Sequence, residues 1–227
     1  MSTTSTDRKV DQTDSQVGAQ FDALTQPVVA VRRRTIDKIM IGIGVVATGA
    51  FVVAGSLLAY GANFSDDYVH DELASQNISF PEADALTGQG RDDLVKYAGQ
   101  QVTTGPQAEA YASYIDGHLE ETAGGQTYAD LGAVERSATA AVTEAVENGE
   151  PQAAVDELQA QADEVSAQRN TLFKGETLRG LLLSAFAWST VGMIAGYAAI
   201  GAFIAAGTMA VLVVLGIVHL RRTPATT

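Results

Sequence analysis

Two long uncharged apolar blocks are the feature of this chain that most limits how it can fold. The first covers residues 39–64, 26 residues, and the second covers residues 180–220, 41 residues. A helix rises about 1.5 Å per residue, so each block can cross the roughly 30 Å hydrocarbon core of a bilayer. The first block lies behind 38 residues and exceeds the apolar core of a signal peptide, about 7–15 residues. We therefore expect a protein of the plasma (inner) membrane with an uncleaved first span, with cleavage near Ala59-Tyr60-Gly61 as the alternative.

The second block is too long for one simple crossing. It forms either one span preceded by a helical stem outside the membrane, or a hairpin that turns near residues 196–201. Basic residues precede the first span and follow the second block, and the positive-inside rule places both groups in the cytoplasm. Two crossings satisfy this rule and three do not, and residues 180–220 contain no Pro, Asn or Asp to mark a turn. We therefore expect two spans. The topology-setting residues are Arg32, Arg33, Arg34, Lys38, Arg221 and Arg222.

This threading makes the central part of the chain an external domain that holds most of the acidic charge. Residues 61–178 contain 22 Asp and Glu against five Lys and Arg. Such a surface attracts cations or a basic partner, or simply keeps the domain soluble. A chain with a formal net charge of −13 offers no basic face for nucleic acid. The expected segments are a disordered cytoplasmic tail (1–35), transmembrane helix 1 (36–64), an acidic extracytoplasmic helical domain (65–178), an external or interfacial stem (179–197), transmembrane helix 2 (198–220) and a short cytoplasmic tail (221–227).

Apolar periodicity makes the domain helical. One helix begins at Thr104 and Pro106 and stops at Gly124-Gly125, a second ends at Asn148-Gly149, and a third starts at Pro151. The first span continues to about residue 75, an extended stretch follows at 77–81, and a weaker helix covers 91–99. No alternating Val, Ile or Thr run indicates a sheet. The expected fold is all-α: two transmembrane helices flank an antiparallel helical bundle, and a long stem precedes the second span.

The residue types that carry catalysis are scarce. With no cysteine, disulfides, iron–sulfur clusters and thiolate zinc sites are excluded. The chain has no nucleophile elbow, phosphate-binding loop or His-Glu-x-x-His motif. A two-histidine, one-carboxylate iron site would need His70 and His118, which are 48 residues apart. We expect no metal, no cofactor and no enzyme activity.

Tyrosines gather in the middle of the domain and give the only candidate binding patch. Four of seven lie in the window 97–128. Tyr114 and His118 are four residues apart and should share a helix face. The patch would bind a quinone, a glycan or a partner protein, or else the rings supply bulk to an alanine-rich bundle. The candidate binding residues are Tyr111, Tyr114, His118 and Tyr128.

The membrane segments contain small residues instead of charges. Small-x-x-x-small spacing lets helices approach closely. The spans would pack on each other or on other membrane-protein subunits, with a homo-oligomer as a further alternative. The candidate packing residues are Gly44, Gly49, Gly192, Gly196 and Gly201.

Two short runs and the order span, external domain, span carry a resemblance. The runs are Gly124-Gly125-Gln126-Thr127-Tyr128-Ala129-Asp130-Leu131 and residues 170–181, Asn170 to Leu181. In these features, over residues 36–222, the chain resembles a group of actinobacterial two-span membrane proteins of unknown function. Some members carry the label aromatic ring-opening dioxygenase, and the separation of His70 and His118 gives no reason to extend that activity here. The resemblance implies an envelope protein without established catalysis.

These observations favour a non-enzymatic membrane protein that serves as an accessory or scaffold component of an envelope or respiratory assembly. The alternative is a sensory or ligand-binding helical ectodomain. Only seven residues follow the second span, so such a sensor would signal through a partner.

Overall fold

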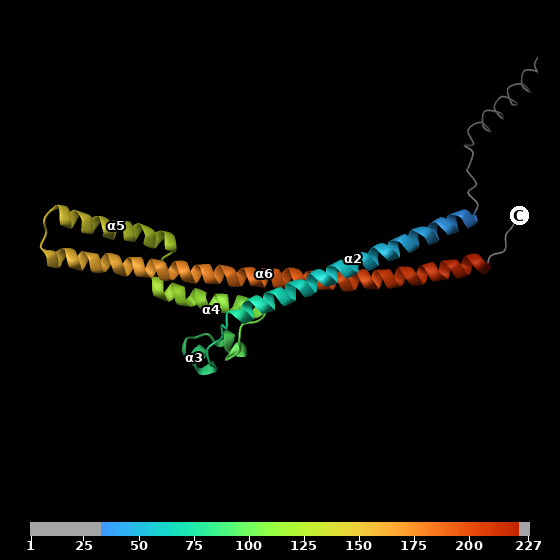
Figure 1. Ribbon diagram of the computed structural model, residues 1–227. Helices are drawn as coiled ribbons and strands as arrows, with labels where there is room; N and C mark the ends of the chain where they lie inside the picture. Colours follow the sequence, from blue (N-terminus) through green and yellow to red (C-terminus); the bar gives the residue numbers. More distant parts are fainter. Residues whose placement is uncertain (1–32, 223–227) are drawn as a thin grey trace, which may run out of the picture. The chain divides into compact units, whose positions relative to one another are not determined.

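The computed structural model describes residues 33–222, and every regular element in that range is a helix. The elements are α2 (Arg33–Ser75), α3 (Ala83–Gly88), the 3₁₀ helix η1 (Asp92–Tyr97), α4 (Gly105–Ala123), α5 (Tyr128–Glu147) and α6 (Gln152–Arg222) (Figure 1). Within residues 33–222 the only β-type pairing is an isolated antiparallel bridge between Ser79 and Gln101. The all-helical expectation is therefore confirmed.

Both apolar blocks lie within long, unbroken helices. α2 has 43 residues and ends at Ser75, as expected, and α6 has 71 residues. Neither contains a proline, the residue that most often breaks a helix. The hairpin alternative does not occur, because α6 passes through residues 196–201 without a turn. The expected limits of the stem at 178/179 and 197/198 are therefore not helix boundaries.

Part of the expected cytoplasmic tail needs correction. Residues 1–32, Arg32 among them, and residues 223–227 lie outside the described residues. Residues 33–35, which we assigned to the disordered tail, form the first turn of α2 instead. Arginine is a good helix former and nothing between it and the apolar block interrupts a helix.

Local capping explains where the shorter helices begin and end. Thr104 and Gln107 form a capping box at the start of α4, and Gly124, with φ 58°, ends it in the left-handed region. Thr127 and Asp130 form the same box at the start of α5, which stops before Gly149, φ 71°. The predicted helix limits at Thr104, Gly124 and Asn148-Gly149 are confirmed, as is the start of the next helix after Pro151. The weaker helix expected at 91–99 is the 3₁₀ helix η1, and α3 was not expected.

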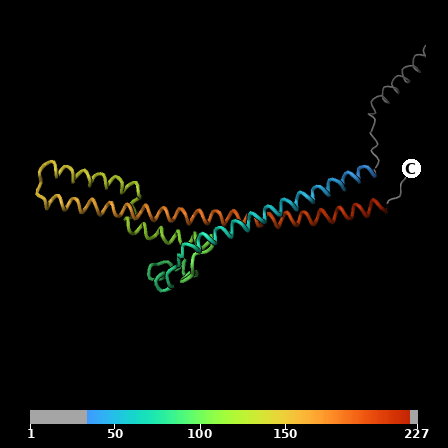
Figure 2. Tube along the Cα trace, in the orientation of Figure 1, coloured from blue at the N-terminus to red at the C-terminus, as the bar shows by residue number. Residues whose placement is uncertain are grey.

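Contacts divide the described chain into two units, and the smaller one pairs the start of α2 with the end of α6. It comprises residues 33–49 and 206–222, and the other unit is Ala50–Ala205. Gly216 lies against Ile41, and Gly44 lies against Val213. Because rising numbers on α2 meet falling numbers on α6, the helices run antiparallel. The first turns of α2 and the last turns of α6 therefore share one end of this unit (Figure 2).

In the larger unit, α6 is the helix on which the others pack (Figure 1). The pairs that fix the register are Gly55–Phe203 and Ser65–Gly192 for α2, Gly105–Ser189 and Leu119–Gly175 for α4, and Tyr128–Phe173 and Glu135–Arg169 for α5. In each case the residue numbers rise along the first helix as they fall along α6, so α2, α4 and α5 all run antiparallel to α6. Residues 76–103, which we call the small lobe, connect α2 to α4 and contain α3 and η1.

The main apolar cluster lies where the small lobe meets α2, α4 and α6. Its buried members are Val69, Leu73, Phe80, Leu86, Leu94, Val102, Ala108, Ala112, Tyr114 and Leu182. A smaller cluster joins α4, α5 and α6 through Ala123, Leu131 and Leu172. Alanines leave little apolar area to bury, and the small lobe supplies four of the eight larger side chains of this cluster, Phe80, Leu86, Leu94 and Val102.

Candidate functional site

Three of the four candidate binding residues lie together on α4. The ring centroids of Tyr111 and Tyr114 are 5.5 Å apart, and those of Tyr114 and His118 are 4.6 Å apart. Phe80 of the small lobe extends this row, with its centroid 5.2 Å from both Tyr111 and Tyr97. We call Phe80, Tyr97, Tyr111, Tyr114 and His118 the aromatic cluster.

The polar end of the aromatic cluster is the Tyr114–His118 pair. The Tyr114 hydroxyl lies 3.1 Å from His118 Nε2, a hydrogen bond across one helical turn. Tyr114 is buried while His118 is exposed. The pair therefore connects a buried phenol to solvent. At the other end, burial raises the pKa of Tyr111, and the nearby Tyr114 hydroxyl adds to this effect.

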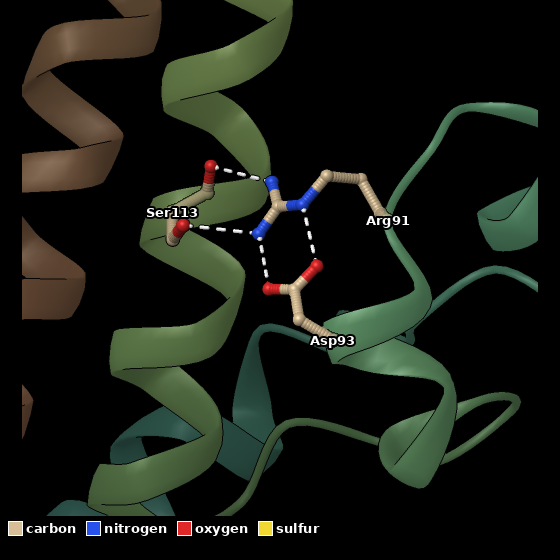
Figure 3. A network of polar contacts seen from close by, with 3 residues as sticks. All are labelled: Arg91, Asp93 and Ser113. Carbon is tan, nitrogen blue, oxygen red and sulfur yellow. Dashed lines mark hydrogen bonds and ion pairs between the residues drawn. The ribbon is translucent and has the colours of Figure 1, made fainter.

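Arg91 attaches the small lobe to Ser113 of α4, the residue before Tyr114 of the aromatic cluster; Figure 3 shows the contacts of Arg91 with Asp93 and Ser113. Its Nε and Nη2 donate to the two carboxylate oxygens of Asp93 at 3.0 and 2.9 Å. Its Nη1 donates to the Ser113 carbonyl oxygen at 2.9 Å, and Nη2 also donates to Ser113 Oγ at 3.0 Å. Donation of these hydrogen bonds to Asp93 raises the pKa of Arg91, and their acceptance lowers the pKa of Asp93. One guanidinium thus holds two segments 22 residues apart, a role for which its planar fork is suited.

Tyr128 lies elsewhere, at the start of α5. Its ring lies 4.3 Å from Arg169 Cζ of α6, a cation–π contact, and 5.9 Å from the Phe173 ring. Arg169 Nη1 also donates to a carboxylate oxygen of Glu135. Hydrogen bonds from Ser166 and then Arg169 lower the pKa of Glu135. These groups border a cavity of about 280 Å³. Arg169 Nε is buried without a hydrogen-bond partner. It lies against Gly132, 3.3 Å from the position that a Cβ on this glycine would occupy. The cluster joins α5 to α6.

A groove between α2 and α6 in the larger unit was not anticipated from the sequence. It has a volume of about 290 Å³, and its lining residues are Tyr68, Val69, Glu72, Leu73, Gln76, Ile78, Leu178, Leu181, Leu182, Ser184, Ala185 and Trp188. Tyr68 and Trp188 are 51% and 56% exposed, so the groove has two open aromatic edges. The only tryptophan, which lies within the second apolar block, was a signal that could have directed attention here.

The five candidate packing glycines separate into two groups. Gly44 lies against Val213, Gly192 against Ser65 and Gly196 against Ala62, all between α2 and α6. Ser65 is buried and its Oγ donates to the Trp188 carbonyl oxygen at 2.7 Å, which reinforces the contact at Gly192. Space is open around Gly49 and Gly201, where nothing lies within 4 Å of an added Cβ. Gly55 and Gly216 also lie at the α2–α6 contact, although we did not select them.

The topology-setting residues that the structure describes lie at the ends of the two long helices. Arg33, Arg34 and Lys38 are in the first turns of α2, and Arg221 and Arg222 end α6. The antiparallel pairing of the smaller unit brings these turns to one end.

Among residues 33–222, no group of three or more His, Asp or Glu side chains could hold a metal ion. What the arrangement offers chemically is aromatic stacking, a phenol–imidazole hydrogen bond and an apolar groove. No family model, curated protein or solved structure matches this chain.

Proposed function

We propose that this chain is a two-span integral membrane protein that acts as a non-enzymatic accessory or scaffold component of a larger envelope or respiratory assembly. The observation that supports it is the exposure of the two long apolar helices. Their most apolar 18-residue windows have mean hydropathies of 2.1 and 2.4, yet only 11% and 6% of these windows are buried. A core helix of a soluble protein would be mostly buried, whereas lipid satisfies an apolar face that protein leaves open.

Retention of the first span is part of the proposal. Gly44 and Gly55 of α2 accommodate Val213 and Phe203 of α6, and the Ser65 hydroxyl bonds to α6 as well. A cleaved signal peptide would have no use for such fitted contacts. With both basic ends in the cytoplasm, Ala50–Ala205 would carry the extracytoplasmic helical domain and its acidic surface.

The open faces at Gly49 and Gly201 support a scaffold role, because close approach of another helix needs small residues that the chain itself does not cover. The test is purification of the tagged full-length protein from its own membranes in mild detergent. We expect a stoichiometric membrane-protein partner that is lost in Gly49→Leu or Gly201→Leu and retained in the neighbouring control Ala50→Leu. Purification as a single species that none of the three substitutions alters would contradict the proposal.

The groove at Trp188 favours a second candidate function, a sensory or ligand-binding ectodomain. Its volume of about 290 Å³ lies at the small end of the range for small-molecule sites. Because Trp188 is the only tryptophan, its fluorescence reports occupancy directly. Saturable quenching by extracted envelope lipids or quinones that Leu181→Phe abolishes, and that Leu183→Phe, on the same helix but outside the groove, leaves intact, would favour this function.

A further inference from the structure

The smaller unit contains a second groove, which reaches the end of that unit where the basic residues gather. It lies between the start of α2 and the end of α6 and has a volume of about 380 Å³. Its walls are apolar over most of their length, formed by Met40 and Ile41 of α2 and by Met209, Leu212 and Val213 of α6. Met40 and Leu212 are 62% and 56% exposed, so the groove opens to the side. On α2 it extends over two turns, about 10 Å.

The polar residues of this groove are confined to one end. Asp37 and His219 line the groove there. Lys38, next to Asp37, and Arg221 and Arg222, shortly after His219, are all exposed, and Arg34 lies one turn before Lys38. Asp37 is the only carboxylate of these turns and is half-buried. Cationic side chains therefore outnumber anionic ones at the mouth of an apolar groove.

We propose that this groove binds an anionic phospholipid, with one acyl chain along Met40, Met209 and Leu212 and the phosphodiester against Lys38, Arg221 and Arg222. The inference rests on the proposed membrane placement of α2 and α6. The apolar walls can hold the hydrocarbon chain of any lipid, so they favour binding but do not discriminate between headgroups. The cations supply the selectivity, because basic residues at the end of a transmembrane helix attract anionic headgroups and gain nothing net from a zwitterionic one.

The experiment is native mass spectrometry of the full-length protein, delipidated in mild detergent and titrated with phosphatidylglycerol or phosphatidylcholine carrying identical chains. We expect one phosphatidylglycerol to bind roughly 30- to 150-fold more tightly than phosphatidylcholine, the selectivity that two or three cations provide. Arg221→Gln with Arg222→Gln should remove this preference, and Lys38→Gln should reduce it. The matched control is Arg136→Gln with Lys174→Gln, two exposed cations of the other unit, which should leave it unchanged.

The apolar half of the proposal has its own matched pair. Leu212→Trp fills the groove and should weaken binding of both lipids, whereas Leu215→Trp, at a leucine equally exposed at 58% but outside the groove, should not. Equal binding of the two headgroups, or unchanged binding in Leu212→Trp, would overturn the proposal. A dimer that Leu212→Trp dissociates would assign the groove to a second copy and also overturn it.

Failure of this inference is distinguishable from failure of the proposed function. Release of the protein from its membranes by alkaline carbonate would contradict the two-span function itself. A protein that resists carbonate but shows no headgroup preference would overturn the lipid site alone.

Discussion

Gly105, in the first turn of α4, is the position where one added carbon should have the clearest effect. A Cβ there would lie 2.3 Å from Ser189 Cβ and 2.4 Å from Ser189 Oγ, with Phe186 Cα at 3.5 Å. Non-bonded carbons pack at about 3.5–4.0 Å, so roughly 1.2 Å of overlap must be relieved. Ser189 Cβ is fixed to the α6 backbone and cannot rotate away. The start of α4 must therefore move from α6, which we expect to cost about 1–3 kcal/mol.

Gly117→Ala is the matched control on the same helix. An added Cβ there meets only Arg91 Nη1, at an ordinary 3.7 Å. Alanine favours a helix interior over glycine by about 0.8–1.0 kcal/mol, so this change should be neutral or stabilising. A rescue variant tests the geometry itself. Ser189→Gly removes the atoms that Gly105→Ala would meet, and the double variant should show a favourable coupling of about 1–2 kcal/mol.

The assay is denaturant unfolding in mild detergent, followed by the fluorescence of Trp188. This residue is the only tryptophan and is adjacent to Ser189, so it reports the α4–α6 contact. The reasoning would be refuted if Gly105→Ala were as stable as Gly117→Ala, or if Ser189→Gly gave no rescue.

Three further predictions concern the small lobe and the aromatic cluster. Arg91→Gln should weaken attachment of the lobe by about 1–3 kcal/mol, since the substitution removes a charged group that makes four hydrogen bonds. Faster amide hydrogen exchange at Leu86 and Leu94 would show this weakening, and unchanged exchange would contradict the prediction. Asp93 has a lowered pKa, so its contribution to stability should be present above its ordinary pKa of 3.8 and lost as the pH falls through its pKa in the folded protein. The acid unfolding of Asp93→Asn should lack this pH-dependent loss of stability. An acid-unfolding profile identical to that of the wild type would exclude the contribution. Tyr111 has a raised pKa, so stability should fall as the pH rises from the ordinary value of 10.0 through the folded value; absorbance titration near 295 nm should show one late phenolate that Tyr111→Phe removes.

The helix limits were predictable because they depend on local chemistry. The Thr104–Gln107 and Thr127–Asp130 capping boxes, and the left-handed Gly124 between them, are readable from single residues and their spacing. The unbroken course of α6 was harder to predict. Its glycines permit a turn, and the absence of Pro, Asn and Asp only disfavours one.

The candidate site was predictable only where its residues share one helix. Tyr111, Tyr114 and His118 follow each other at spacings of three and four, so their contact follows from helix geometry. Tyr128 lies beyond the end of α4, and its partner Arg169 is 41 residues away. The partners of Arg91 likewise depend on how the small lobe folds back on α4.

Helix register decides which glycines are covered, and composition does not reveal register. Gly44 and Gly49 are five residues apart, about 140° around a helix, so they cannot both face one partner. The structure places Gly44 at Val213 and leaves space open around Gly49. Only the pairing of α2 with α6 makes that distinction.

The most direct test of the two-span account uses single cysteines, because the natural chain has none. Ser2→Cys, Ser137→Cys and Thr227→Cys variants are treated in intact cells with a membrane-impermeant maleimide, before and after the membrane is opened. The account predicts labelling of Ser137→Cys in intact cells, and of Ser2→Cys and Thr227→Cys only after opening. Labelling of Thr227→Cys from outside while Ser2→Cys stays protected, or protection of Ser137→Cys, would contradict it.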